Sequence, residues 1–222
     1  LAALQAAAEA DPGNHDLLSR IAVVAIRRKE MDTAIEALER SYHHDPKSYE
    51  RCVDLAAGYQ AGSRREEAVA QYRKALKLDD ARGAVYVALA GLYFRVNEDK
   101  EALRTLERGH KRADNAGLVH LYTYEQAKRF VAHGALKRAI PCFARLAEWD
   151  EKRRHQFYHV LGELHLAVED EAGAIKVLTR ATQLKNGLPE SFIDLAAIHI
   201  RTDKEKGLNI LKEASDRLPD EP

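Results

Sequence analysis

Small residues recur along this chain at nearly fixed intervals. Five alanines and one glycine form the series, and the steps between them are 34, 34, 37, 35 and 33 residues. The series consists of Ala34, Ala68, Ala102, Ala139, Ala174 and Gly207. A sequence that resembles itself at a fixed period of this size is typical of a solenoid, in which supersecondary repeats stack on one another. Solenoids mostly present surfaces to partners, so the period favours binding over catalysis.

The residues around each alanine repeat as well. Four of the six repeats carry an apolar or aromatic residue, then a leucine with a small residue beside it, then a large residue, and finally the alanine or glycine of the series. The second and third repeats read Cys52-x2-Leu55-Ala56-x2-Tyr59 and Tyr86-x2-Leu89-Ala90-x2-Tyr93, followed by Ala68-x3-Tyr72 and Ala102-x3-Leu106. This pattern resembles the tetratricopeptide repeat, W-x2-L-G-x2-Y followed by A-x3-F and a proline. Six matches in phase cover essentially the whole chain.

The resemblance implies an all-α, right-handed superhelical solenoid of antiparallel helix pairs. The residues agree with it, because apolar side chains spaced three and four apart predict amphipathic helices. Small residues near the middle of each first helix let two helix axes approach closely. We expect first helices at about 15–28, 50–60, 83–95, 118–132, 155–167 and 189–201. Second helices are expected at about 31–44, 65–78, 99–113, 136–149, 171–185 and 205–217.

We expect one domain over residues 1–222, with a leading half-repeat at 1–14 and repeats at about 15–48, 49–82, 83–119, 120–154, 155–188 and 189–219. The fourth repeat departs from the pattern. Gln126 stands where leucine is usual, and Pro141 predicts a second helix that starts late or bends, because proline is tolerated only in the first turn. Gly109 also replaces an alanine, and the sixth repeat has a turn one residue shorter.

The two ends lack partners within the repeat pattern. Residues 1–10 correspond to a second helix without its first, and no further helix follows Leu208, Leu211 and Leu218. Solenoids need polar caps at their ends. We therefore expect either a piece of a longer protein or ends that pair with something else.

Composition excludes several function classes. Basic and acidic residues number 35 each, so the formal net charge is zero, whereas a nucleic-acid-binding protein normally has a basic surplus. No apolar stretch is long enough for a membrane span, and residues 1–10 lack the basic start of a signal peptide. Cys52 and Cys142 are two repeats apart, too far for a disulfide, and this favours a reducing compartment such as the cytoplasm.

Histidines provide the only candidates for chemistry. His155, His159 and Glu163 are spaced to share one helix face, and imidazole and carboxylate groups can bind zinc. The simpler interpretation is that they make polar contacts, because side chains in a row along one helix rarely converge on a metal. His165 and His199 occupy places held by tyrosine elsewhere, which favours packed, hydrogen-bonded side chains. Without a phosphate loop or nucleophile motif, we expect no enzyme activity, metal or cofactor.

The first helices should line a concave groove, where related proteins bind their partners. Some members of this family hold a partner's carboxylates with Lys, Asn and Arg side chains at these places. Here the first three repeats have small or apolar residues instead, so an acidic C-terminal tail is an unlikely ligand. The candidate groove residues are Val53, Ala57, Val87, Gly91, Phe94, Tyr124, Lys128, His159 and Glu163. Alternatively, Val53 and Val87 simply pack against the neighbouring repeat.

Three functions follow from these observations. The first, which we favour, is an adaptor or scaffold that binds a peptide or helix of a partner protein. The second is a structural module that assembles with copies of itself through its ends. The third, an enzyme that uses the histidine face, is the least supported.

Overall fold

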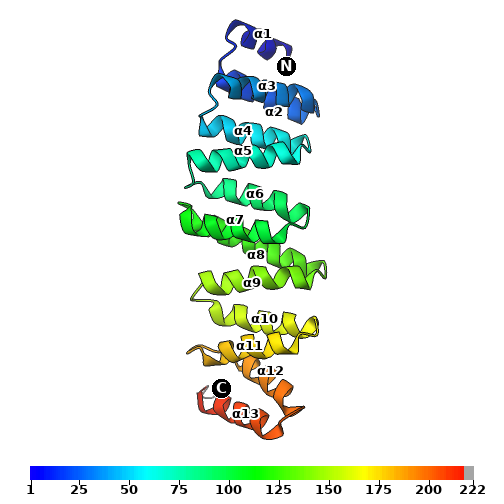
Figure 1. Cartoon of the computed structure of the whole chain (residues 1–222), viewed down its shortest axis with the longest axis vertical. Coiled ribbons are helices and arrows are strands. Elements are labelled where there is room, and N and C mark those ends of the chain that lie inside the picture. The colour runs from blue at the N-terminus through cyan, green and yellow to red at the C-terminus, as the bar shows by residue number, and fades with distance from the viewer. Residues whose placement is uncertain (218–222) are drawn as a thin grey trace. The chain divides into compact units, whose positions relative to one another are not determined.

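The computed structural model describes residues 1–217, and these form helices joined by short turns (Figure 1). In chain order the helices are α1 (Ala2–Ala10), α2 (His15–Arg27), α3 (Met31–His44), α4 (Tyr49–Ala61), α5 (Arg65–Leu78), α6 (Gly83–Arg95), α7 (Asp99–Arg112), α8 (Ala116–Ala132), α9 (Leu136–Trp149), α10 (Arg154–Ala167), α11 (Glu171–Gln183), α12 (Pro189–Ile200) and α13 (Lys204–Arg217). These bounds confirm the helix pairs expected from the repeat pattern to within a few residues. Leu218, expected at the end of α13, lies outside the described residues.

The chain forms two compact units, Leu1–Val119 and the part from His120 onward. Within the first unit, each first helix packs against its own second helix, as α2 does with α3, α4 with α5 and α6 with α7. Contacts between α3 and α4 and between α5 and α6 then join one pair to the next. The second unit repeats this arrangement with α10, α11, α12 and α13. First helices also meet directly, α2 with α4 and α10 with α12.

The small residues of the repeat form the centre of these contacts. Every member of the series from Ala34 to Gly207 is buried, as is the small residue in the middle of each first helix. The latter are Ala22, Ala56, Ala90, Ala127, Gly162 and Ala196. Without longer side chains the helix axes can lie close together, and larger residues such as Tyr72 and Leu106 fill the space beside them. Cys52 and Cys142 are both fully buried, and both are free thiols.

Five first helices end in the same way. A residue with positive φ follows each of them, and these residues are Lys29, Ser63, Asn97, Gly134 and Glu169. The next backbone N–H then donates to a carbonyl of the last helical turn, as Arg64 does to Tyr59 at 2.8 Å and Glu98 to Tyr93 at 3.0 Å. This is the Schellman pattern, which satisfies carbonyls that the helix leaves unpaired. The sixth repeat lacks the positive-φ residue among its described positions, in keeping with its shorter turn.

Proline does not delay α9. The helix begins at Leu136, so one of the two outcomes expected from Pro141, a late start, is wrong. Pro141 lies in the second turn, where its missing N–H leaves one carbonyl without the usual helical partner. The buried residues Ala139, Phe143 and Leu146 anchor α9 in the core on both sides of the proline, and their packing offsets the lost hydrogen bond.

Candidate functional site

In the first unit, the predicted groove residues lie on α4 and α6. Ala57 is exposed, and the side chains of Val53 and Val87 are half-buried. Gly91 is half-buried as well. Phe94 differs from the expectation, because it is only 6% exposed. Its side chain therefore belongs to the hydrophobic core.

Asp54 joins two neighbouring first helices beside these residues. The hydroxyl of Ser19 on α2 donates to the Asp54 carboxylate on α4 at 3.0 Å. The ring of His15 lies 3.6 Å from the same carboxylate oxygen and bonds Ser41 at 2.7 Å through its other nitrogen. Val23 is 50% exposed on the same helix as Ser19. The face of the first helices therefore combines polar links between helices with exposed small apolar side chains.

In the second unit, Tyr124 is part of an aromatic cluster. Its ring makes edge contacts with Phe143 and Phe157, with ring centroids 6.4 and 6.2 Å apart. Lys128 lies one turn along α8, with its ammonium nitrogen 5.2 Å from the Tyr124 ring centre and 3.2 Å from a Glu125 carboxylate oxygen. Cation–π contacts of this kind fix the orientation of an aromatic side chain.

Arg153 completes the cluster from the turn before α10. Its guanidinium carbon lies 5.3 Å from the Phe157 ring centre and 5.8 Å from that of Tyr124. The Asp150 carboxylate accepts a hydrogen bond from Arg153 at 2.7 Å and lies 3.6 Å from the ring of His120. Partial burial works against ionisation of Asp150, but the hydrogen bonds from Arg153 outweigh it and lower the pKa of this carboxyl group. An ionised Asp150 keeps Arg153 over both rings.

The three residues considered as metal ligands do not form a metal site. His155 bonds the side chain of Asn186 at 2.8 Å. His159 lies between two carboxylates, 3.8 Å from Glu163 and 3.7 Å from Asp194 on α12. Within residues 1–217, no group of three or more His, Cys, Asp and Glu side chains is arranged to hold a metal ion.

His165 bonds the Asp170 carboxylate at 2.8 Å. The backbone N–H of Gly173 also donates to Asp170, at 2.9 Å, and caps α11. These two hydrogen bonds, first that from Gly173, lower the pKa of Asp170. His165 is thus a hydrogen-bonded structural residue, as its place in the repeat predicted.

Sequence reasoning missed Asp54 and Asp194. The two occupy equivalent places, Asp54 directly after Val53 and Asp194 directly after Ile193, and each links its own helix to the preceding first helix through Ser19 or His159. The regular spacing of the repeats would have shown that these two aspartates are equivalent.

None of the helices in the described part of the chain is long and apolar enough to pass through a membrane.

Comparisons with known proteins identify the fold. No protein-family model and no curated protein matches the sequence. Among solved structures, a tetratricopeptide repeat protein from Parabacteroides merdae has a TM-score of 0.52 at 15% identity, over 98% of this chain and 85% of its own. YrrB, described as a TPR protein with an unusual peptide-binding site, has a TM-score of 0.50 at 18% identity, over 95% of this chain and 98% of its own.

A third similar structure is MamA (41-end) from Desulfovibrio magneticus RS-1, with a TM-score of 0.50 at 17% identity, over 77% of this chain and 94% of its own. At sequence identities this low, the similarity shows a shared fold and does not extend to ligands. It agrees with the repeated helix pairs, the buried small residues at the helix contacts and the repeat pattern of the sequence. The chain therefore has the tetratricopeptide-repeat fold.

Proposed function

We propose that this protein is a binding scaffold that holds an amphipathic segment of a partner protein against its first helices. The observation that carries the proposal is the row of small apolar residues on consecutive first helices. Val23 is 50% exposed, Ala57 is exposed, and Val87 and Gly91 are partly accessible. Short side chains leave room for a partner backbone, and an apolar strip on a protein surface often marks a contact site. YrrB, with the same fold, is described as having a peptide-binding site, which supports this proposal.

The second unit has a separate, more polar contact surface on its own first helices. Tyr124 presents part of an aromatic ring whose orientation is fixed by Lys128 and Arg153. Glu163 is 60% exposed, and His159 beside it is 16% exposed. Aromatic rings are common anchors at interfaces, and charged groups around them set specificity and association rate more than affinity. We propose that Tyr124 is an anchor and that Lys128 and Glu163 select the partner.

The groove proposal predicts that Val87→Glu weakens binding of an apolar segment. The test begins with selection of a binder from a displayed library of amphipathic peptides, whose amide shift changes should map to α4 and α6. Burying the new carboxylate against an apolar partner costs free energy. The loss of the valine contact alone lowers the affinity by about tenfold. We expect Val87→Glu to raise Kd at least that much, with an unchanged helical circular dichroism spectrum.

Val96→Glu is the matched control. Val96 follows α6, is 41% exposed and lies outside the proposed surface, so its substitution should leave Kd within about twofold. If both variants bound equally well, or if the shift changes mapped to the second helices, the proposed surface would be wrong.

Self-association is the second candidate, and one observation favours it. Leu208 and Leu211 on α13 are 51% and 36% exposed. Light scattering over a concentration series distinguishes the two functions, because a scaffold without its partner keeps a constant mass. A mass that rises with concentration and returns to the monomer value in Leu208→Glu would favour assembly.

A further inference from the structure

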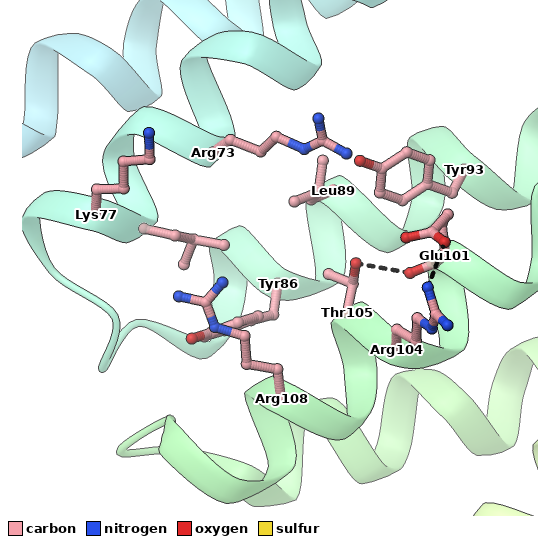
Figure 2. A pocket seen from close by; sticks show the side chains of 10 residues that line it. Arg73, Lys77, Tyr86, Leu89, Tyr93, Glu101, Arg104, Thr105 and Arg108 are labelled. Carbon is pink, nitrogen blue, oxygen red and sulfur yellow. Dashed lines mark hydrogen bonds and ion pairs between the residues drawn. The ribbon is translucent and has the colours of Figure 1, made fainter.

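A cleft of about 300 Å³ lies in the first unit between the side chains of α5, α6 and α7 (Figure 2). None of the candidate groove residues lines it. Its charged side chains come from α5 and α7, and α6 adds a leucine and two tyrosines. The residues that matter for its chemistry are Arg73, Lys77, Tyr86, Glu101, Arg104 and Arg108.

The cleft has a surplus of positive charge. Four cations line it, against the single carboxylate of Glu101. Arg104 is paired with that carboxylate at 3.0 Å. The other three cations, Arg73, Lys77 and Arg108, make no ion pair with any carboxylate in residues 1–217. In a chain with as many acidic as basic residues, three uncompensated cations around one cleft create a local field that attracts anions.

Tyr86 provides an independent observation. Its side chain is 0% exposed, and among the described residues no group accepts a hydrogen bond from its hydroxyl. Figure 2 shows the guanidinium group of Arg108 at the hydroxyl end of this ring, and the guanidinium carbon lies 5.9 Å from the ring centre. A buried hydroxyl without an acceptor is costly and calls for an explanation. An anion bound in the cleft would supply the acceptor.

The hydroxyl keeps its proton for such a bond. Burial raises the pKa of Tyr86, and the positive charge of Arg108 only partly opposes this rise. Tyr86 is therefore a neutral donor at pH 7. The Thr105 hydroxyl is already engaged, because it donates to the backbone carbonyl of Glu101 at 2.7 Å.

We propose that this cleft binds a phosphate monoester. A dianion with three acceptor oxygens matches several uncompensated cations and a tyrosine hydroxyl better than a carboxylate does. The guanidinium forks of Arg73 and Arg108 suit phosphate, which accepts paired hydrogen bonds from arginine. The surplus is confined to one cleft of a neutral chain, so the ligand is a single phosphate group and not the extended phosphate array of a nucleic acid. The proposal is independent of the groove, since the two sites share no residue.

The experiment is a titration of the full chain with inorganic phosphate, followed by amide shift changes. We expect saturable binding at one site, with the changes concentrated in α5 and α7. Loss of one charge-assisted hydrogen bond corresponds to about tenfold in affinity, which is the weakening expected for Arg108→Gln. Tyr86→Phe, which keeps the ring, should weaken binding about threefold, as expected for the loss of a neutral hydrogen bond.

Arg112→Gln is the matched control. Arg112 lies one turn beyond Arg108 on α7, is paired with Asp80 at 3.0 Å and does not line the cleft. Its loss removes the same charge, yet affinity should change by less than about twofold if the site is specific. Equal weakening by Arg108→Gln and Arg112→Gln would overturn the proposal, because affinity would then report diffuse surface charge. Acetate bound as tightly as phosphate would also overturn it.

Two further ligands identify the source of the phosphate group. Tighter binding of a Gly-Gly-phosphoserine-Gly-Gly peptide than of glycerol 3-phosphate would indicate a phosphorylated partner protein. The reverse order would indicate a small phosphorylated molecule, and both results support the site. A short DNA oligonucleotide that bound more tightly than either would overturn the assignment of a single phosphate group.

Discussion

Phe157→Ala should lower the free energy of unfolding of the second unit by about 3–5 kcal/mol, the usual cost of removing a buried phenylalanine ring. Phe157 is 4% exposed, and its ring lies 6.2 Å from both Tyr124 and Phe143. It also lies under the Arg153 guanidinium. The substitution therefore leaves a cavity among several aromatic rings and removes a cation–π contact as well. Urea denaturation followed by circular dichroism measures the loss.

Two variants separate packing from other effects. Phe157→Leu keeps most of the apolar volume and should cost less than about 1.5 kcal/mol. Ile193→Ala, in the same unit but 56% exposed, should change stability by less than about 0.5 kcal/mol. A Phe157→Ala protein as stable as the Ile193→Ala protein would show that the rings do not form a packed cluster.

The repeat period made the helices predictable. A series of buried small residues occurs once per repeat, so the positions of the helix pairs follow from the sequence even in the fourth repeat. A late start of α9, one of the two outcomes expected from Pro141, is wrong because the local rule for proline takes no account of the buried residues on either side, which hold the helix in place. The positive φ of Lys29, Ser63 and Glu169 was also beyond prediction, because these residue types rarely adopt it.

The sequence predicted which helices carry the candidate residues, but it did not predict how far each side chain is buried. Register placed Val87, Tyr124 and His159 on first helices, where the structure has them. Register does not say how far a side chain is covered, so Phe94 was expected at the surface although it is buried. The cleft above Tyr86 depends on side chains from three helices at once, and no spacing within a single repeat indicates it.

The position of Tyr86 explains why Gly109 replaces the usual alanine of the repeat. An alanine is usual at this place, as Ala75 is in the preceding repeat, but a Cβ atom on Gly109 would lie 2.7 Å from Cγ and 2.8 Å from Cβ of Tyr86. Because Cβ is fixed to the backbone, Tyr86 cannot move aside by changing rotamer. Cys52 stands at the equivalent place in the preceding repeat, opposite Ala75, and both are fully buried. In the third repeat, the large residue on the first helix thus goes with a glycine on the second.

Gly109→Ala should therefore lower the free energy of unfolding by about 1–3 kcal/mol through overpacking. This is the opposite of the usual result in a helix, where alanine is more favourable than glycine by about 1 kcal/mol. Gly117→Ala, in α8, is the control. Its Cβ would meet only the Asn115 side chain at an ordinary 3.5 Å, so this variant should be as stable as the parent or more so. Thermal and urea denaturation measure both.

The decisive comparison places Gly109→Ala in a Tyr86→Cys background, which recreates the Cys52 and Ala75 pair of the preceding repeat. Tyr86→Cys alone should cost about 3–5 kcal/mol, because it removes a fully buried ring. Adding Gly109→Ala should then cost nothing or restore some stability, since the alanine occupies part of the space that the ring leaves. The two substitutions should be coupled by at least about 1 kcal/mol, as expected for residues in direct contact. Equal costs of Gly109→Ala in both backgrounds would mean that the glycine is not set by the size of Tyr86.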